Sequence, residues 1–129
     1  MILWVLLVLS MPVHAALRIR HWYRLSDAWI FQARDEAARI SQPADLFFIN
    51  SQDEPFYLYH LHRKGYVVHL EGGGRDIFEQ KVREGVKFLF TPAHETGEHW
   101  PQYETSIAKR FRLVYRDENY SIYDLTQKP

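Results

Sequence analysis

The chain alternates between segments with helical spacing of apolar residues and short runs that are apolar throughout. Residues 26–43 (SDAWIFQARDEAARISQP) repeat apolar side chains every three or four positions, which predicts an amphipathic helix. These positions are Trp29, Ala33, Ala37 and Ile40. Ser26 suits the N-cap of this helix, and Pro43 ends it. Residues 44–51 (ADLFFINS) then form a continuous apolar run, which is typical of a strand covered on both faces.

The alternation continues to the end of the sequence. It predicts a helix over 53–66, a strand over 66–71, a helix over 73–85, a strand over 86–92, a helix over 102–111, and a hairpin with strands 112–115 and 120–125 around a polar turn. We expect Gly65 and Gly85 to cap the C-terminal ends of their helices. Ile77, Phe78 and Val82 are expected to face inward.

Three alternations of strand and helix before a hairpin are typical of a small α/β domain. We therefore expect two or three layers, with a mostly parallel sheet of three strands, right-handed crossovers and a C-terminal β-hairpin. Residues 26–129 would form this domain.

The first residues have a different character, because residues 1–17 carry no charged side chain. The favoured interpretation is a transmembrane-type helix over 1–18 that contacts membrane lipid, followed by a basic linker over 19–25, with Met1 an internal or truncated start. A secretory signal cleaved after Ala15 and a buried soluble helix are the alternatives. Arg18, Arg20 and Arg24 fit neither membrane interpretation well, because such residues usually lie on the cytoplasmic side.

Composition narrows the function. A formal net charge of +0 gives no electrostatic basis for binding nucleic acid. The absence of cysteine excludes disulfides, a thiolate nucleophile and cysteine-ligated metals. No cofactor is expected for this chain.

Residues 91–102 (TPAHETGEHWPQ) place two histidines and two glutamates close together. Zinc peptidases of the His-Glu-x-x-His type need histidines four positions apart on one helical face, whereas His94 and His99 are five apart. Glycine and flanking prolines favour a loop after the third strand. We reject the peptidase interpretation and assign no metal ligands, although a loop could still gather His94, Glu98 and His99 around a metal ion. These three residues are kept as candidates for contact with a polar partner.

A glycine-rich turn, residues 71–76 (EGGGRD), follows the second strand and begins a helix. Gly72, Gly73, Gly74 and Arg75 could bring backbone N–H groups and a positive charge to a phosphate or sugar, or could simply form a flexible connection. The aromatic and basic residues 57–66 are likewise open to two interpretations, as core residues or as a surface for a headgroup or sugar.

Three stretches carry a resemblance to a known family: residues 55–66, from Pro-Phe-Tyr-Leu-Tyr to Arg-Lys-Gly-Tyr, GVKFLF at residues 85–90, and YSIYDL at residues 120–125. Together with the preceding apolar helix, the chain resembles the C-terminal part of bacterial GT-C-type glycosyltransferases similar to dolichyl-phosphate-mannose protein mannosyltransferases. The resemblance covers essentially the whole chain and rests on packing residues.

This resemblance implies an inner-membrane enzyme that transfers a sugar from a polyprenyl phosphate, with the present domain on the extracytoplasmic or periplasmic side. The family's catalytic acidic residue lies in an earlier loop, so no catalytic residue is assigned here. The chain would be a non-catalytic domain that caps the transmembrane part of the enzyme and assists acceptor or partner binding. The alternative is a free-standing secreted or membrane-tethered binding domain. An independent hydrolase or metalloenzyme is supported only by the two histidines, whose spacing does not match a zinc peptidase.

Overall fold

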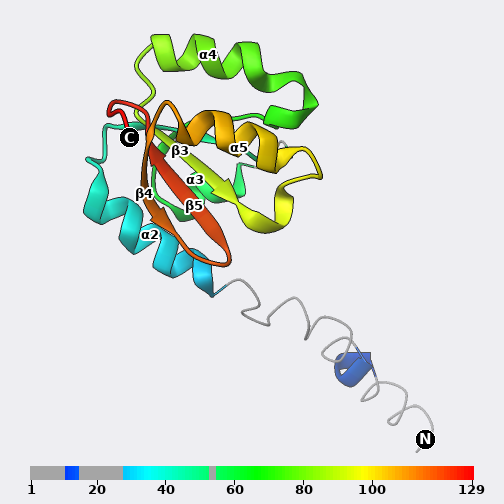
Figure 1. Cartoon of the computed structure of the whole chain (residues 1–129). Coiled ribbons are helices and arrows are strands. Elements are labelled where there is room, and N and C mark those ends of the chain that lie inside the picture. The colour runs from blue at the N-terminus through cyan, green and yellow to red at the C-terminus, as the bar shows by residue number, and fades with distance from the viewer. Residues whose placement is uncertain (1–10, 15–27, 53–54) are drawn as a thin grey trace, which may run out of the picture.

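A computed structural model describes residues 11–14, 28–52 and 55–129 (Figure 1). In chain order its elements are α2 (Trp29–Ile40), β1 (Leu46–Ile49), α3 (Phe56–His60), β2 (Lys64–Val67), η1 (Leu70–Gly74), α4 (Arg75–Arg83), β3 (Phe88–Pro92), η2 (Ala93–Glu95), α5 (Trp100–Ala108), β4 (Arg112–Arg116) and β5 (Tyr120–Asp124).

The predicted membrane segment falls mostly outside these residues. Residues 11–14 are helical, whereas the rest of 1–18, the linker over 19–25 and the proposed N-cap Ser26 are not described. Within the described ranges, no helix has the length and apolarity needed to cross a bilayer.

All the strands belong to one sheet of order β2-β1-β3-β5-β4. The first three strands are parallel, and β5 runs antiparallel to both β3 and β4. The predicted α/β class, the parallel strands and the C-terminal hairpin are therefore confirmed. The hairpin also extends the sheet, because its second strand inserts beside β3.

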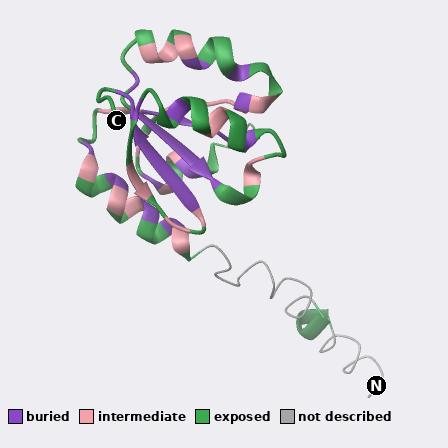
Figure 2. Cartoon of the chain, viewed as in Figure 1, coloured by how far each residue is buried: buried purple, intermediate pink, exposed green. Residues whose placement is uncertain are grey.

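Helices cover both faces of the sheet, so the domain has three layers (Figure 1). On one face, α2 and α3 bury Ala33, Ala37 and Tyr57 against alternate residues of β1, β3 and β5. On the other face, α4 and α5 bury Phe78 and Ile107 against the intervening strand residues. The central strands β3 and β5 are buried along their whole length (Figure 2). Burial on both faces explains why β3 reads as a continuous apolar run, whereas β5 includes Ser121 and Asp124 among its buried residues.

The predicted cap at Gly65 is wrong. Helix α3 ends at His60, and His62 takes the left-handed backbone conformation with φ 51°. Gly65 lies inside β2 beside Phe47, where an added Cβ would stand 1.7 Å from the Phe47 carbonyl oxygen. Strand β2 consequently starts earlier than predicted and ends at Val67, and residues 70–74 form the irregular turn η1.

The predicted cap at Gly85 is confirmed. Its φ is 100°, its N–H donates to the carbonyl of Val82, and the N–H of Val86 donates to the carbonyl of Lys81. These two bonds form a Schellman motif, which satisfies carbonyls at the end of α4.

Side-chain exposure corrects one expectation for α4 and shows both core and surface residues in α3. Phe78 is buried and Val82 is partly buried, but Ile77 is 43% exposed, so the apolar face of α4 is narrower than predicted. In α3, Tyr57 belongs to the core while Tyr59 is 76% exposed. A helix of this length has room for only one buried side.

Candidate functional site

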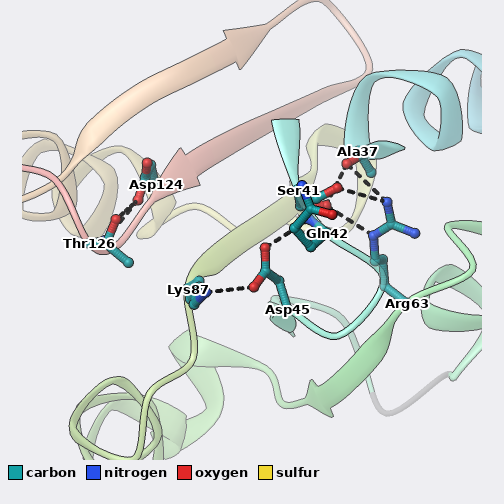
Figure 3. Close-up of polar contacts among 8 residues, drawn as sticks. All are labelled: Ala37, Ser41, Gln42, Asp45, Arg63, Lys87, Asp124 and Thr126. Atoms are coloured by element: carbon teal, nitrogen blue, oxygen red, sulfur yellow. Dashed lines mark hydrogen bonds and ion pairs between the residues drawn. The ribbon is translucent and has the colours of Figure 1, made fainter. Parts of the chain in front are cut away.

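The two ends of the parallel strands differ in how their polar groups are used. At the amino ends, the groups satisfy one another (Figure 3). Lys87 donates to Asp45 at 2.6 Å and lowers the pKa of that carboxyl, together with the backbone N–H of Gln42. Arg63 donates to the Ser41 hydroxyl and to the Ala37 carbonyl. The polar groups at the amino ends are therefore partners of one another, which leaves the carboxyl ends as the place for a candidate site.

The carboxyl ends contain the switch point of the sheet. From β1 the chain crosses to β2 on one side, while β3 lies on the other side, so loops leave β1 and β3 in opposite directions. In open α/β sheets, such a point is the usual place for ligands. Asn50, which follows β1, is fully buried there and accepts a hydrogen bond from the N–H of Leu70 at 2.9 Å, while its side-chain NH₂ has no protein partner.

Glu95 lies at this switch point and ties the two loops together. Its carboxylate accepts hydrogen bonds from the Tyr57 hydroxyl at 2.5 Å and from the N–H of Gln52 at 3.1 Å. Burial raises the pKa of Glu95, but the neighbouring hydroxyls of Ser51 and Tyr57 and the N–H of Gln52 outweigh it, so the net pKa is below its usual value. Glu95 was not among the predicted site residues.

Of the three predicted loop residues, only His94 joins this group. Its ring lies 5.8 Å from that of Trp29, and its Nε2 is 3.1 Å from the Tyr57 hydroxyl. Glu98 and His99 are exposed, and His99 precedes the first turn of α5. The prediction of a βα loop is confirmed, and the loop does not gather His94, Glu98 and His99 around one point.

The glycine turn forms a separate, shallow hollow of about 430 Å³, lined by Gly72, Gly73 and Gly74 with Gln52, Val68, His69 and Ile77. Arg75 does not line this hollow, because its guanidinium lies over the ring of Tyr103 at 4.6 Å. The glycine turn and the histidine loop meet at another point, where Glu71 accepts a hydrogen bond from the N–H of Gly97 at 2.9 Å.

A second pocket, of about 210 Å³, lies on the α5 side of the same loop, and we call it the α5 pocket. Its lining includes Thr91, Thr96, Trp100, Glu104, Arg116 and Ser121. The strand register brings together the residues at the floor of the pocket. Thr91 of β3 pairs with Ser121 of β5, and Ser121 pairs with Arg116 of β4. Paired residues on neighbouring strands project to the same face of a sheet.

Arg116 and Glu104, two charged residues that line the α5 pocket, are partners of each other. Arg116 forms an ion pair with Glu104 and donates to the Tyr123 hydroxyl at 2.7 Å, and that hydroxyl donates to Glu104 at 3.0 Å. Burial and the nearby carboxylate of Glu104 raise the pKa of Tyr123 to about 12, so the phenol stays neutral.

Residues 91–100 contain both the predicted contact residues His94, Glu98 and His99 and three lining residues of the α5 pocket. Histidines and glutamates stand out in TPAHETGEHW as candidate chemistry, whereas Thr91, Thr96 and Trp100 from the same stretch line the pocket. The available signal was Thr91 itself, which is a hydroxyl residue in an otherwise apolar strand.

Among the residues that the structure describes, no cluster of His, Asp or Glu side chains is suited to holding a metal ion. A comparison with protein-family models found no match, and comparisons with curated proteins and with solved structures found none either.

Proposed function

We propose that this chain is the non-catalytic, extracytoplasmic domain of a membrane glycosyltransferase that uses a polyprenyl-phosphate sugar. In this proposal, residues 1–18 anchor the chain in the inner membrane. The α/β domain caps the transmembrane part of the enzyme and assists in binding the acceptor.

One observation supports this arrangement most directly: α2 begins at the carboxyl edge of the sheet. Trp29, in the first turn of α2, packs against the rings of His94, Tyr57 and Tyr120 at centroid distances of 5.8, 6.1 and 5.7 Å. The proposed anchor therefore connects to the domain at the same edge as the switch point and the loop after β3.

The connection also limits how far this edge can lie from the proposed membrane. Residues 18–27 separate the apolar run from the described part of α2. Fully extended, ten residues reach roughly 35 Å. The carboxyl edge would thus face the membrane part of the enzyme, and the amino edge with its closed ion pairs would face away.

The membrane part of this proposal is tested by fusing alkaline phosphatase, which is active only outside the bacterial cytoplasm, after Pro129. We expect phosphatase activity from the full chain and retention in the membrane after carbonate extraction. A variant without residues 1–17 should lose both properties. Recovery of the full-chain fusion in the soluble periplasmic fraction would instead support a cleaved signal and contradict an anchor.

The glycosyltransferase part is tested by the DNA upstream of the Met1 codon. An in-frame region encoding several apolar helices would support the proposed parent enzyme. An unrelated gene with its own stop codon, followed by a ribosome-binding site for Met1, would contradict it and favour a free-standing tethered binding domain.

A further inference from the structure

We propose that the α5 pocket binds one neutral hexopyranose unit. The pocket lies on the opposite side of the β3–α5 loop from Glu95 and its partner Tyr57. It contains none of the residues that the sequence analysis predicted to contact a ligand or partner. Three observations point to this ligand: an unpartnered hydroxyl in the floor, charged groups that already have partners, and a tryptophan in the lining.

The first observation is the hydroxyl of Thr91. Thr91 is only 2% exposed, and its Oγ1 has no hydrogen-bond partner in the described structure. A buried polar atom without a partner is costly, so such atoms are rare in native proteins. Thr91 lines the pocket, and a ligand hydroxyl there would complete the missing bond.

The second observation is that the charged groups of the pocket already have hydrogen-bond partners. Arg116 is engaged by Glu104, and the carboxylate of Asp117 accepts hydrogen bonds from the backbone N–H groups of Asn119 and Tyr120. An anionic ligand would compete with Glu104 for Arg116 and would meet Asp117 as a like charge. Neutral hydroxyl groups can add to this network without displacing any member of it, because guanidinium and carboxylate groups retain further hydrogen-bonding capacity.

The third observation concerns shape and the tryptophan in the lining. Trp100 lines the pocket and is 7% exposed. The negative face of an aromatic ring attracts the weakly positive C–H groups of a sugar ring. The volume of about 210 Å³ corresponds to about seven waters at roughly 30 Å³ each, which is comparable to one pyranose with its hydroxyls.

The test is titration of the full chain, in a detergent without a sugar headgroup, with methyl α- and β-hexopyranosides. Tryptophan fluorescence reports on binding. We expect a saturable change in the millimolar range for at least one hexoside. Thr91→Val should weaken this binding about fivefold, because it removes one hydrogen bond.

The same substitution provides its own control for folding. Valine has the shape of threonine and favours strands, so Thr91→Val should leave the melting temperature unchanged or raise it by removing a buried hydroxyl without a partner. Weaker sugar binding by a variant at least as stable as the wild type would not follow from a purely structural role. His94→Gln, on the other side of the loop, should bind hexosides like the wild type.

The proposal is overturned if fluorescence shows no saturable change at hexoside concentrations up to about a hundred times the expected millimolar dissociation constant. It is also overturned if Thr91→Val and the wild type bind hexosides with equal affinity, or if inorganic phosphate binds more tightly than any hexoside. Hexose 1-phosphate separates two sources of the sugar. Binding of the hexoside as tight as, or tighter than, that of the phosphate ester supports a neutral acceptor glycan. Preference for the ester would also overturn the proposal of a neutral ligand, because it contradicts the charge argument and supports a donor headgroup.

Assigning the hexose to an acceptor glycan rests on the proposed function, whereas binding of the hexose itself does not. The two therefore fail separately. Loss of the membrane-anchored topology with intact hexoside binding would leave a sugar-binding domain, and the reverse result would leave a membrane-anchored domain whose α5 pocket has another role.

Discussion

Glu95 holds the switch point together through contacts that depend on its charge. The Glu95 carboxylate accepts hydrogen bonds from the Tyr57 hydroxyl and from the N–H of Gln52, and the Glu95 side chain is only 18% exposed. Hydrogen bonds to a charged acceptor are stronger than those to a neutral one. The stability of this edge should therefore vary with pH.

Glu95→Gln tests this dependence. Because the pKa of Glu95 is lower in the folded chain than its usual value of 4.5, the charge stabilises the fold above that pH and the contribution is lost as pH falls through the folded pKa. We expect Glu95→Gln to cost about 1–2 kcal/mol at pH 7, and much less at acidic pH below the folded pKa. Urea unfolding at both pH values measures the difference.

Glu98→Gln is the matched control, since Glu98 belongs to the same loop and is exposed. It should change the free energy of unfolding little at either pH. A cost of Glu95→Gln that is the same at neutral and acidic pH would show that the charge of Glu95 is not what stabilises the loop.

At the scale of elements, Gly65 and Gly85 were both predicted to cap helices, but they have different structural roles. Gly85 ends α4 with a positive φ, and an added Cβ would have no atom within 4 Å. Gly65 lies in β2, where an added Cβ would collide with the backbone of Phe47. The first position needs an uncommon backbone conformation, and the second needs the space itself.

Alanine at these two positions should separate the roles. Gly85→Ala should destabilise the domain by about 1 kcal/mol through backbone strain. Gly65→Ala should cost about 3 kcal/mol or more, because the pair β1–β2 must move apart. Chemical denaturation of both variants measures this order, and equal costs would show that β2 can shift to accommodate a side chain.

These glycines also illustrate what the sequence could predict. The apolar runs at residues 44–51 and 86–92 predicted buried strands, because burial on both faces leaves a strong local pattern, and β1 and β3 lie within these runs. The end of α3 could not be predicted, since His62 ends the helix in a conformation for which glycine is the usual residue. Gly65 was predicted to cap a helix because its strand partner, Phe47, is distant in the sequence and the local pattern gives no sign of their pairing.

The candidate site was less predictable than the fold for a related reason. Titratable residues can be recognised as candidate site residues from the sequence alone. The α5 pocket instead depends on the cross-strand register of Thr91, Ser121 and Arg116, which come from three strands. Register is a property of the assembled sheet. Local patterns could place the loop after β3 and could not indicate which of its side chains face α5.

At the scale of the whole molecule, the proposed anchor would place one edge of the sheet nearer the membrane than the other. The carboxyl edge should lie nearer the membrane than the amino edge. The sequence contains no cysteine, so a single introduced cysteine reports on one position without a background.

We expect a fluorophore on Glu98→Cys, at the carboxyl edge, to be quenched by lipids with nitroxide headgroups more strongly than one on Gln42→Cys, at the amino edge. Both parent residues are exposed, so neither substitution should disturb the core. Proteoliposomes containing the full chain allow the comparison. Stronger quenching at position 42 would reverse the proposed orientation.

The position of β5 has a consequence for synthesis. Tyr120–Asp124 is the last strand in the sequence, yet it lies between β3 and β4 and is buried throughout. Until the ribosome has released this segment, β3 has an open hydrogen-bonding edge and an uncovered apolar surface. The domain therefore passes through a stage in which the described helices have been made but the sheet is incomplete, and the open edge of β3 favours aggregation during that interval.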